Sequence, residues 1–72
     1  MTFQEHDVVR LRRSLPNSVV QAGSRGAIVF VYEGGQAYEV EFCDEAGITL
    51  ALVTLTKEDL EVWVPSKEPP AR

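Results

Sequence analysis

Four of the five glycines lie between residues 23 and 42, and the stretch Gly23-Ser24-Arg25-Gly26 has a spacing that could cradle a phosphate. A phosphate-binding loop, however, leads into a helix whose first amides hold the anion, and a Lys-Ser or Lys-Thr pair follows its glycines. Residues 27–32 form an apolar run that predicts a strand instead. The Gly-x-x-Gly clamp for single-stranded RNA also sits between helices. The spacing therefore favours a sharp turn, in which we expect Gly26 to have a positive φ or a close backbone approach.

The residues that could support catalysis or bind a metal are few and dispersed along the chain. His6 and Cys43 are the single histidine and the single cysteine, and a nucleophilic pair would need the fold to bring them together. Glu39 and Glu41 alternate along one predicted strand, where acids usually face solvent, whereas a metal needs several converging ligands. No base adjoins the serines of the predicted loops, Ser14, Ser18 and Ser24. We therefore expect a protein that is not an enzyme and that holds no metal or cofactor.

The size and charge of the chain narrow the remaining classes. Its 72 residues suffice for one domain, with a stability of about 3–5 kcal/mol. The net charge of −4 argues against a general nucleic-acid binder. The charge is uneven, since residues 1–26 carry four arginines and two acids, and residues 27–64 carry one lysine and eight acids. The lone cysteine, the missing signal peptide and the lack of a long apolar run predict a cytoplasmic protein outside the membrane.

The elements that position these side chains are strands, because the apolar residues recur with a period of two. We expect strands over residues 7–12, 27–32, 37–43, 48–55 and 61–64, with a hairpin turn at residues 33–36. Thr56 and Asp59 resemble a capping box, which predicts one short 3-10 turn before the last strand. This pattern predicts an all-β fold, a small, strongly bent five-stranded barrel over residues 1–64, followed by a flexible tail over residues 65–72.

Several short motifs follow one another in the order of a known family. They are Asp7-Val8-Val9-x-Leu11, Leu15-Pro16, Gly23-x-x-Gly26-x-Ile28-Val29-x-Val31-Tyr32, Tyr38-Glu39-Val40-Glu41-Phe42, Gly47-x-Thr49-x-Ala51, Thr54-Leu55 and Asp59-Leu60. Over residues 7–64 the chain thereby resembles a bacterial family of short stand-alone proteins, the domain of unknown function 4926. The resemblance implies an SH3-like barrel and transfers no catalytic residue.

Three functions remain open for such a barrel. The first is a protein-interaction module, such as an antitoxin or immunity-type partner, that covers a basic protein with the acidic strand face of Glu39 and Glu41, with Glu33 nearby. The second is a binder of RNA or of the transcription and translation machinery, since Gly23-x-x-Gly26-x-Ile28-x-x-Val31 is similar to the KOW motif of ribosomal and transcription-factor barrels. Its contacts would come from Arg10, Arg12, Arg13 and Arg25. The third is an accessory subunit of a larger enzyme complex.

The alternation of the strands also predicts an aromatic and cationic patch. The inward set is expected to include Val9, Leu11, Val29, Val31, Tyr38, Val40, Phe42, Leu60, Val62 and Val64. Phe30 and Trp63 then point outward. The strand order of the SH3-like barrel that the resemblance implies puts the first strand between theirs, and this strand presents Arg10 and Arg12. An arginine resting against the rings would form a contact surface for a partner or for a second copy. The alternative is that one or both aromatic side chains lie in the core.

Overall fold

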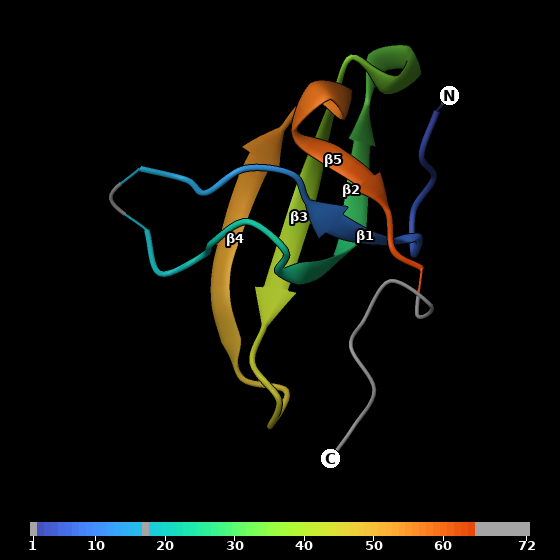
Figure 1. Ribbon diagram of the computed structural model, residues 1–72. Helices are drawn as coiled ribbons and strands as arrows, with labels where there is room; N and C mark the ends of the chain where they lie inside the picture. Colours follow the sequence, from blue (N-terminus) through green and yellow to red (C-terminus); the bar gives the residue numbers. More distant parts are fainter. Residues whose placement is uncertain (1, 17, 65–72) are drawn as a thin grey trace.

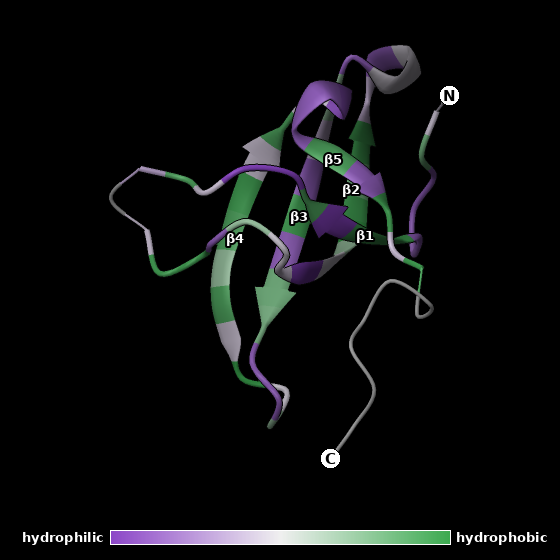
Figure 2. Ribbon diagram, in the orientation of Figure 1, coloured by the Kyte–Doolittle hydropathy of each residue, from purple (hydrophilic) through white to green (hydrophobic). Residues whose placement is uncertain are grey.

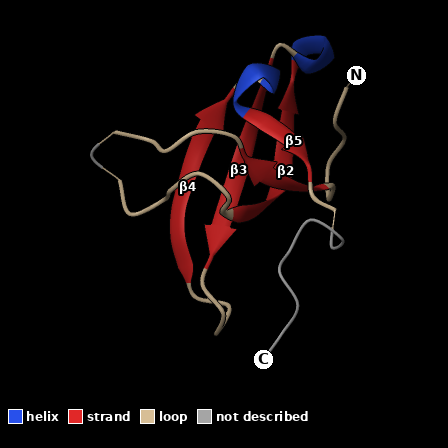
Figure 3. Cartoon of the chain, in the orientation of Figure 1, coloured by secondary structure: helices blue, strands red, loops and turns tan. Residues whose placement is uncertain are grey.

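The computed structural model describes residues 2–16 and 18–64, and the predicted tail over residues 65–72 lies outside the described residues. The elements are β1 (Val8–Leu11), β2 (Arg25–Tyr32), the 3-10 turn η1 (Glu33–Gly35), β3 (Ala37–Cys43), β4 (Thr49–Leu55), the 3-10 turn η2 (Lys57–Asp59) and β5 (Leu60–Val62) (Figure 1). The all-β class and the 3-10 turn before the last strand are confirmed (Figure 3). A second such turn, η1, forms where a hairpin turn was expected. The described part of the chain contains no helix able to cross a membrane.

One antiparallel sheet contains all the strands, in the order β4-β3-β2-β1-β5. The first strand therefore lies between the second and the fifth, as predicted, and pairs with both. The sheet bends strongly around its inner side, and the long β1–β2 connection passes in front of β3 and β4 (Figure 1). Within the described residues, β4 and β5 end the sheet without pairing with each other, so the barrel is approximate and not closed by hydrogen bonds.

The core lies on the inner side of the bent sheet and follows the predicted alternation. Val9 and Leu11 from β1 and Tyr38, Val40 and Phe42 from β3 are buried, and apolar and polar residues alternate along β3 (Figure 2). The remaining core residues are Phe3, Val20, Ile28, Leu55 and Leu60. Period-two patterning therefore predicted the buried residues of β1 and β3 correctly.

A β-bulge in β2 changes which side chains face inward. Ile28 pairs with Val40 and Phe30 pairs with Glu39, so Val29 is an extra residue without a partner on β3. As a result Ile28 is buried, whereas Val29 is 41% exposed and Phe30 is 49% exposed. The prediction that Phe30 points outward agrees with this geometry, and the prediction that Val29 faces the core is wrong. Val31, beyond the bulge, packs partly buried against the core.

The last strand is shorter than expected, because β5 ends at Val62 and not at Val64. Val62 pairs with Val9 and so lies on the inner side of the sheet, but it remains 44% exposed. Val62 lies on an edge strand, with which no further strand pairs in the described residues, and its side chain lines a surface groove. The prediction that Val62 belongs to the core is therefore wrong, whereas Leu60, opposite Leu11, is buried as expected.

Candidate interaction surface

The glycine-rich stretch after β1 turns the chain and leads directly into β2. Gly23 has a φ of 92°, its amide donates to the Leu11 carbonyl over 2.8 Å, and the Leu11 amide donates to the Ser24 carbonyl over 2.8 Å. Strand β2 starts at Arg25, so no helix begins after the glycines. Gly26 has no positive φ, and its restriction comes from neighbouring core side chains instead. The stretch is thus a turn that anchors the end of β1.

The candidate catalytic side chains have structural or exposed positions. His6 lies exposed before β1, and its amide donates to the Ile28 carbonyl; Cys43 is exposed at the end of β3. Each of the loop serines uses its hydroxyl oxygen to accept a backbone amide, as seen for Ser14 with Ala22, Ser18 with Val20 and Ser24 with Gln21. Among the described residues, no three metal-ligating side chains converge. The serines therefore hold the loop between β1 and β2 in shape.

The outer side of the sheet carries the predicted acidic residues in fixed positions. Glu39 accepts hydrogen bonds from the Thr54 hydroxyl over 2.6 Å and from the Tyr32 hydroxyl over 3.2 Å. Glu41 accepts one from the Thr49 hydroxyl over 2.5 Å. Both side chains are half-buried. These bonds orient the carboxylates while leaving them able to accept further bonds, because each oxygen has more than one acceptor site.

Each of these two carboxylates has one large apolar side chain beside it. The strand register places Phe30 beside Glu39 and Leu52 beside Glu41. Phe30 packs edge-to-face on Tyr32, with ring centroids 4.9 Å apart. Residues 27–56 contain five acids and no lysine or arginine. We call the set formed by Phe30, Tyr32, Glu39, Glu41 and Leu52 the acidic face.

The arginine contacts differ from those predicted. Arg25 lies over the ring of Trp63, with its guanidinium carbon 5.1 Å from the ring centroid. In the strand pairing, Arg10 of β1 lies opposite Arg25 of β2 on one side and opposite Glu61 of β5 on the other. Its Nε is 3.7 Å from Glu61 Oε2. The Arg10 side chain is only 15% exposed and also donates to the Gly23 carbonyl over 3.5 Å. The aromatic contact thus belongs to Arg25, which the patch prediction left out.

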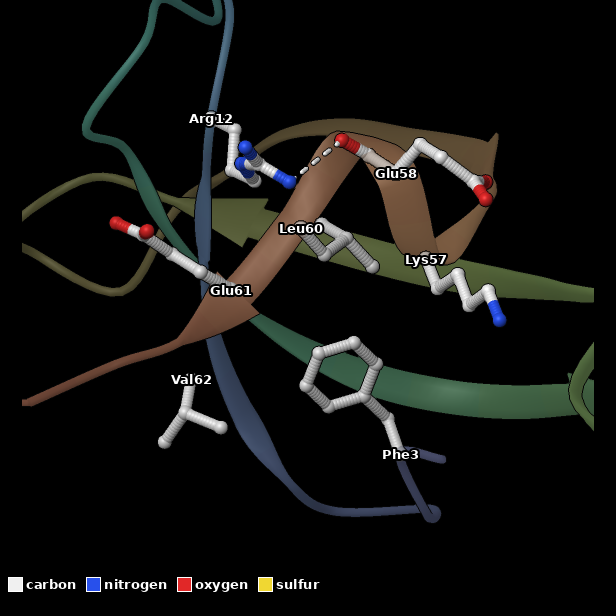
Figure 4. A pocket seen from close by; sticks show the side chains of 7 residues that line it. All are labelled: Phe3, Arg12, Lys57, Glu58, Leu60, Glu61 and Val62. Atoms are coloured by element: carbon white, nitrogen blue, oxygen red, sulfur yellow. Dashed lines mark hydrogen bonds between the residues drawn. The ribbon is translucent and has the colours of Figure 1, made fainter. Parts of the chain in front are cut away.

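The other predicted arginine, Arg12, lies at a groove that is also lined by Glu61, the neighbour of Arg10 (Figure 4). The groove has a volume of about 490 Å³ and is lined by Phe3, Arg12, Lys57, Glu58, Leu60, Glu61 and Val62. Arg12 Nη1 donates to the Glu58 carbonyl over 3.4 Å, the dashed line in Figure 4. Arg12 is therefore held by the η2 turn, and no residue that lines the groove belongs to the acidic face. Sequence reasoning missed this groove because its residues come from three distant segments.

The Arg25–Trp63 contact can be tested by fluorescence, because Trp63 is the only tryptophan of the chain. We expect Arg25→Ala to red-shift the emission and to increase quenching by acrylamide, since the guanidinium that covers part of the ring is lost. The stability should fall by no more than about 0.5–1 kcal/mol. Arg12→Ala is the control and should leave the emission unchanged. A shift in the control alone would show that the contact is assigned to the wrong arginine.

Comparison with known proteins identifies a family for the chain. A family model described as domain of unknown function (DUF4926) matches residues 5–62. No curated protein and no solved structure matches the chain. The matched range contains all the strands of the structure, from Val8 to Val62. Because the match extends over well more than half of the sequence, the protein belongs to this domain of unknown function family.

Proposed function

We propose that the protein is a non-catalytic interaction module of a bacterial cytoplasm, whose acidic face docks on a cationic surface of a partner protein. An antitoxin or immunity-type protein that covers a basic enzyme is the most concrete form of this role. The observation that carries the proposal is the composition of the acidic face. Two oriented carboxylates, Glu39 and Glu41, lie beside exposed apolar side chains. Arg25 lines a groove together with Glu41, but its guanidinium lies over the Trp63 ring.

This arrangement has the two components that a protein interface needs. Phe30, Tyr32 and Leu52 are large and exposed, so their burial against a partner would contribute the apolar part of the affinity. The carboxylates supply charge complementarity, which speeds association and excludes acidic partners. Because hydroxyl groups already hold Glu39 and Glu41, little side-chain entropy is lost on binding. The face is thus suited to recognise a basic surface with apolar residues between its charges.

The contacts of the arginines favour a protein partner over RNA. Arg13 forms a 2.7 Å ion pair with Asp59, and Arg10 is close to Glu61. Arg12 donates to a backbone carbonyl, and Arg25 lies on Trp63. A phosphate backbone would have to compete with these intramolecular contacts and with a net charge of −4. The RNA-binding alternative therefore has weaker physical support.

The proposal predicts that Glu39→Gln/Glu41→Gln weakens partner binding by about tenfold or more, without loss of the fold. The measurement is retention of a basic protein by the tagged chain in a lysate of the native host, followed by titration with the purified partner. Binding by the unmodified chain should weaken as salt shortens the Debye length from about 10 Å at 0.1 M to about 3 Å at 1 M.

The matched control is Glu5→Gln/Glu58→Gln, which removes the same charge from two exposed positions outside the acidic face. It should retain the partner almost fully. Equal weakening by both double variants would mean that net charge alone attracts the partner. A complex that dissolves on ribonuclease treatment would support the RNA-binding alternative instead.

A further inference from the structure

Strand β4 leaves one side of its backbone open. It spans Thr49–Leu55 and pairs with β3, and no other strand within the described residues pairs with it. Strand β4 is seven residues long and contains no charged residue and no proline. The opposite edge strand, β5, has only three residues and carries Glu61. Proteins usually shorten, charge or cover the edges of their sheets, because an open edge pairs with other chains. Within residues 2–16 and 18–64, β5 is short and charged, whereas β4 has neither feature and no second strand pairs with it.

The side chains of β4 are partly buried on the inner side of the sheet and exposed on the outer side. Ala51 and Val53 are partly buried against the core, so the strand is held firmly in place. Leu50 and Leu52 are 45% and 57% exposed on or near the outer side. A second strand laid along β4 would therefore find a rigid hydrogen-bonding edge flanked by uncovered leucine side chains.

We propose that the open edge of β4 receives an extended, cationic segment of the partner protein, which adds a sixth strand to the sheet. This inference rests on the proposed function and states how the partner is bound. Neighbouring strands lie about 4.8 Å apart, so the added strand would lie about 10 Å from β3. A lysine or arginine on its outer side can cross β4 with its methylene stem over Leu52. Its charged group would then meet Glu39 or Glu41.

Charge also distinguishes this occupant from a second copy of the chain. Pairing of β4 with β4 of another copy would place two acidic faces side by side, with Glu39 and Glu41 of each copy on the same outer surface. The two β3 strands would then lie about 14 Å apart across the paired β4 strands, so their like charges would oppose association mainly at low ionic strength. A cationic strand instead neutralises the carboxylates that β3 already presents beside β4. The register of β4 with β3 thus selects a basic segment.

The test uses an acetylated, amidated peptide of alternating lysine and threonine that matches the length of β4. Two analogues carry N-methyl groups on alternate residues, one set on the odd residues and one on the even residues. Because one edge of the peptide would pair with β4, we expect one analogue to lose at least about tenfold in affinity and the other to bind like the parent. The parent peptide should slow hydrogen exchange of backbone amides in Thr49–Leu55.

A matched pair of variants tests the charge requirement at an exposed position. Leu52→Lys should weaken peptide binding by about tenfold, whereas Leu52→Glu should bind at least as well as the unmodified chain. Both changes should preserve the fold, because Leu52 is 57% exposed. Equal binding by both variants would overturn the proposed place of the cationic strand.

Other outcomes separate this inference from the proposed function. If both methylated analogues bind like the parent and Glu39→Gln/Glu41→Gln still weakens binding, strand addition is wrong while the acidic face stands. The absence of peptide binding would overturn strand addition, and so would a dimer of the free chain in sedimentation with protected β4 amides. If Glu39→Gln/Glu41→Gln weakens neither the peptide nor the natural partner, the proposed function itself fails.

Discussion

Gly26→Ala is expected to destabilise the protein by about 1–3 kcal/mol, which is a large part of the stability of a domain of this size. Gly26 is buried in β2, opposite Phe42 of β3. A Cβ atom at this position would lie 2.9 Å from Phe42 Cδ1 and Cε1 and from Val40 Cγ1. Such distances force two packed core side chains to move, and packed cores accommodate added atoms poorly.

The sign of this effect distinguishes crowding from backbone entropy. Alanine restricts the unfolded chain more than glycine does, which alone would stabilise the fold by about 0.4–1 kcal/mol. Crowding against Phe42 should outweigh this gain and lower the melting temperature by roughly 5–20 °C. The measurement is thermal and denaturant unfolding of both chains. An unchanged or raised melting temperature would contradict the packing around Gly26.

Two further variants make the cause of the loss specific. In a Phe42→Leu background, Gly26→Ala should lower the free energy of unfolding by less than in the unmodified chain, because the ring that the added Cβ would meet is gone. Gly47→Ala is the control for backbone strain alone, since Gly47 has a φ of 83° and an added Cβ would meet nothing within 4 Å. Its cost should be about 1–2 kcal/mol and should not depend on Phe42.

The sequence predicted best those parts of the fold in which one strand has one buried side. Tyr38, Val40 and Phe42 alternate with acids, and all of them are buried as their spacing indicates. The period fails at Val29, because a bulge adds one residue to β2 and reverses the order of the side chains beyond it. A bulge depends on the fit between two strands, so the pattern of β2 alone does not contain it.

Contacts between distant segments were the least predictable. Phe3 is buried, lies edge-to-face on Tyr38 with centroids 5.5 Å apart, and donates its amide to the Tyr38 hydroxyl. No periodicity surrounds Phe3 in the sequence, so its place in the core had no local signal. The same holds for the candidate site, where Glu39 and Glu41 followed from alternation but the contact of Arg25 with Trp63 joins residues 38 positions apart. The open edge of β4 likewise follows from the strand order and not from the composition of β4.

Asp59 belongs to a local motif that the sequence predicts, and in the fold it also contacts residues distant in the sequence. The capping box predicted from Thr56 and Asp59 is present around η2, and the Thr56 amide donates to Asp59 Oδ2 over 3.1 Å. The carboxylate is buried, and Arg13, two residues beyond the end of β1, donates to its Oδ1 over 2.7 Å. The Arg12 amide donates to the Asp59 carbonyl over 2.8 Å. Asp59 thereby ties η2 and the start of β5 to the chain that follows β1.

We expect Asp59→Ala to destabilise the protein by about 1–3 kcal/mol at neutral pH. The change removes the acceptor of the Thr56 amide and leaves a cavity beside the Arg13 guanidinium. Arg13→Gln should cost less, at most about 1 kcal/mol, because the Arg13 side chain is largely exposed and solvent screens its charge. Denaturant unfolding of the three chains measures both effects. Equal losses for the two variants would mean that the ion pair, and not the capping of η2, stabilises this corner.

The pH dependence of the unfolding free energy separates the effect of the Asp59 charge from the effect of its hydrogen-bonding geometry. Burial raises the pKa of Asp59, but the hydrogen bonds from the Thr56 amide and the Arg13 guanidinium, with the charge of Arg13, lower the pKa below its ordinary value of 3.8. A carboxylate with a lowered pKa stabilises the fold fully above its unfolded-state pKa, and this stabilisation is lost as the pH falls through the folded-state pKa. Asp59→Asn keeps an acceptor for the Thr56 amide but has no charge to lose. The difference in unfolding free energy between the unmodified chain and Asp59→Asn should therefore be constant above about pH 5 and should narrow toward about pH 3. A difference that does not change with pH over this range would show that the charge of the Asp59 carboxylate does not stabilise the folded protein.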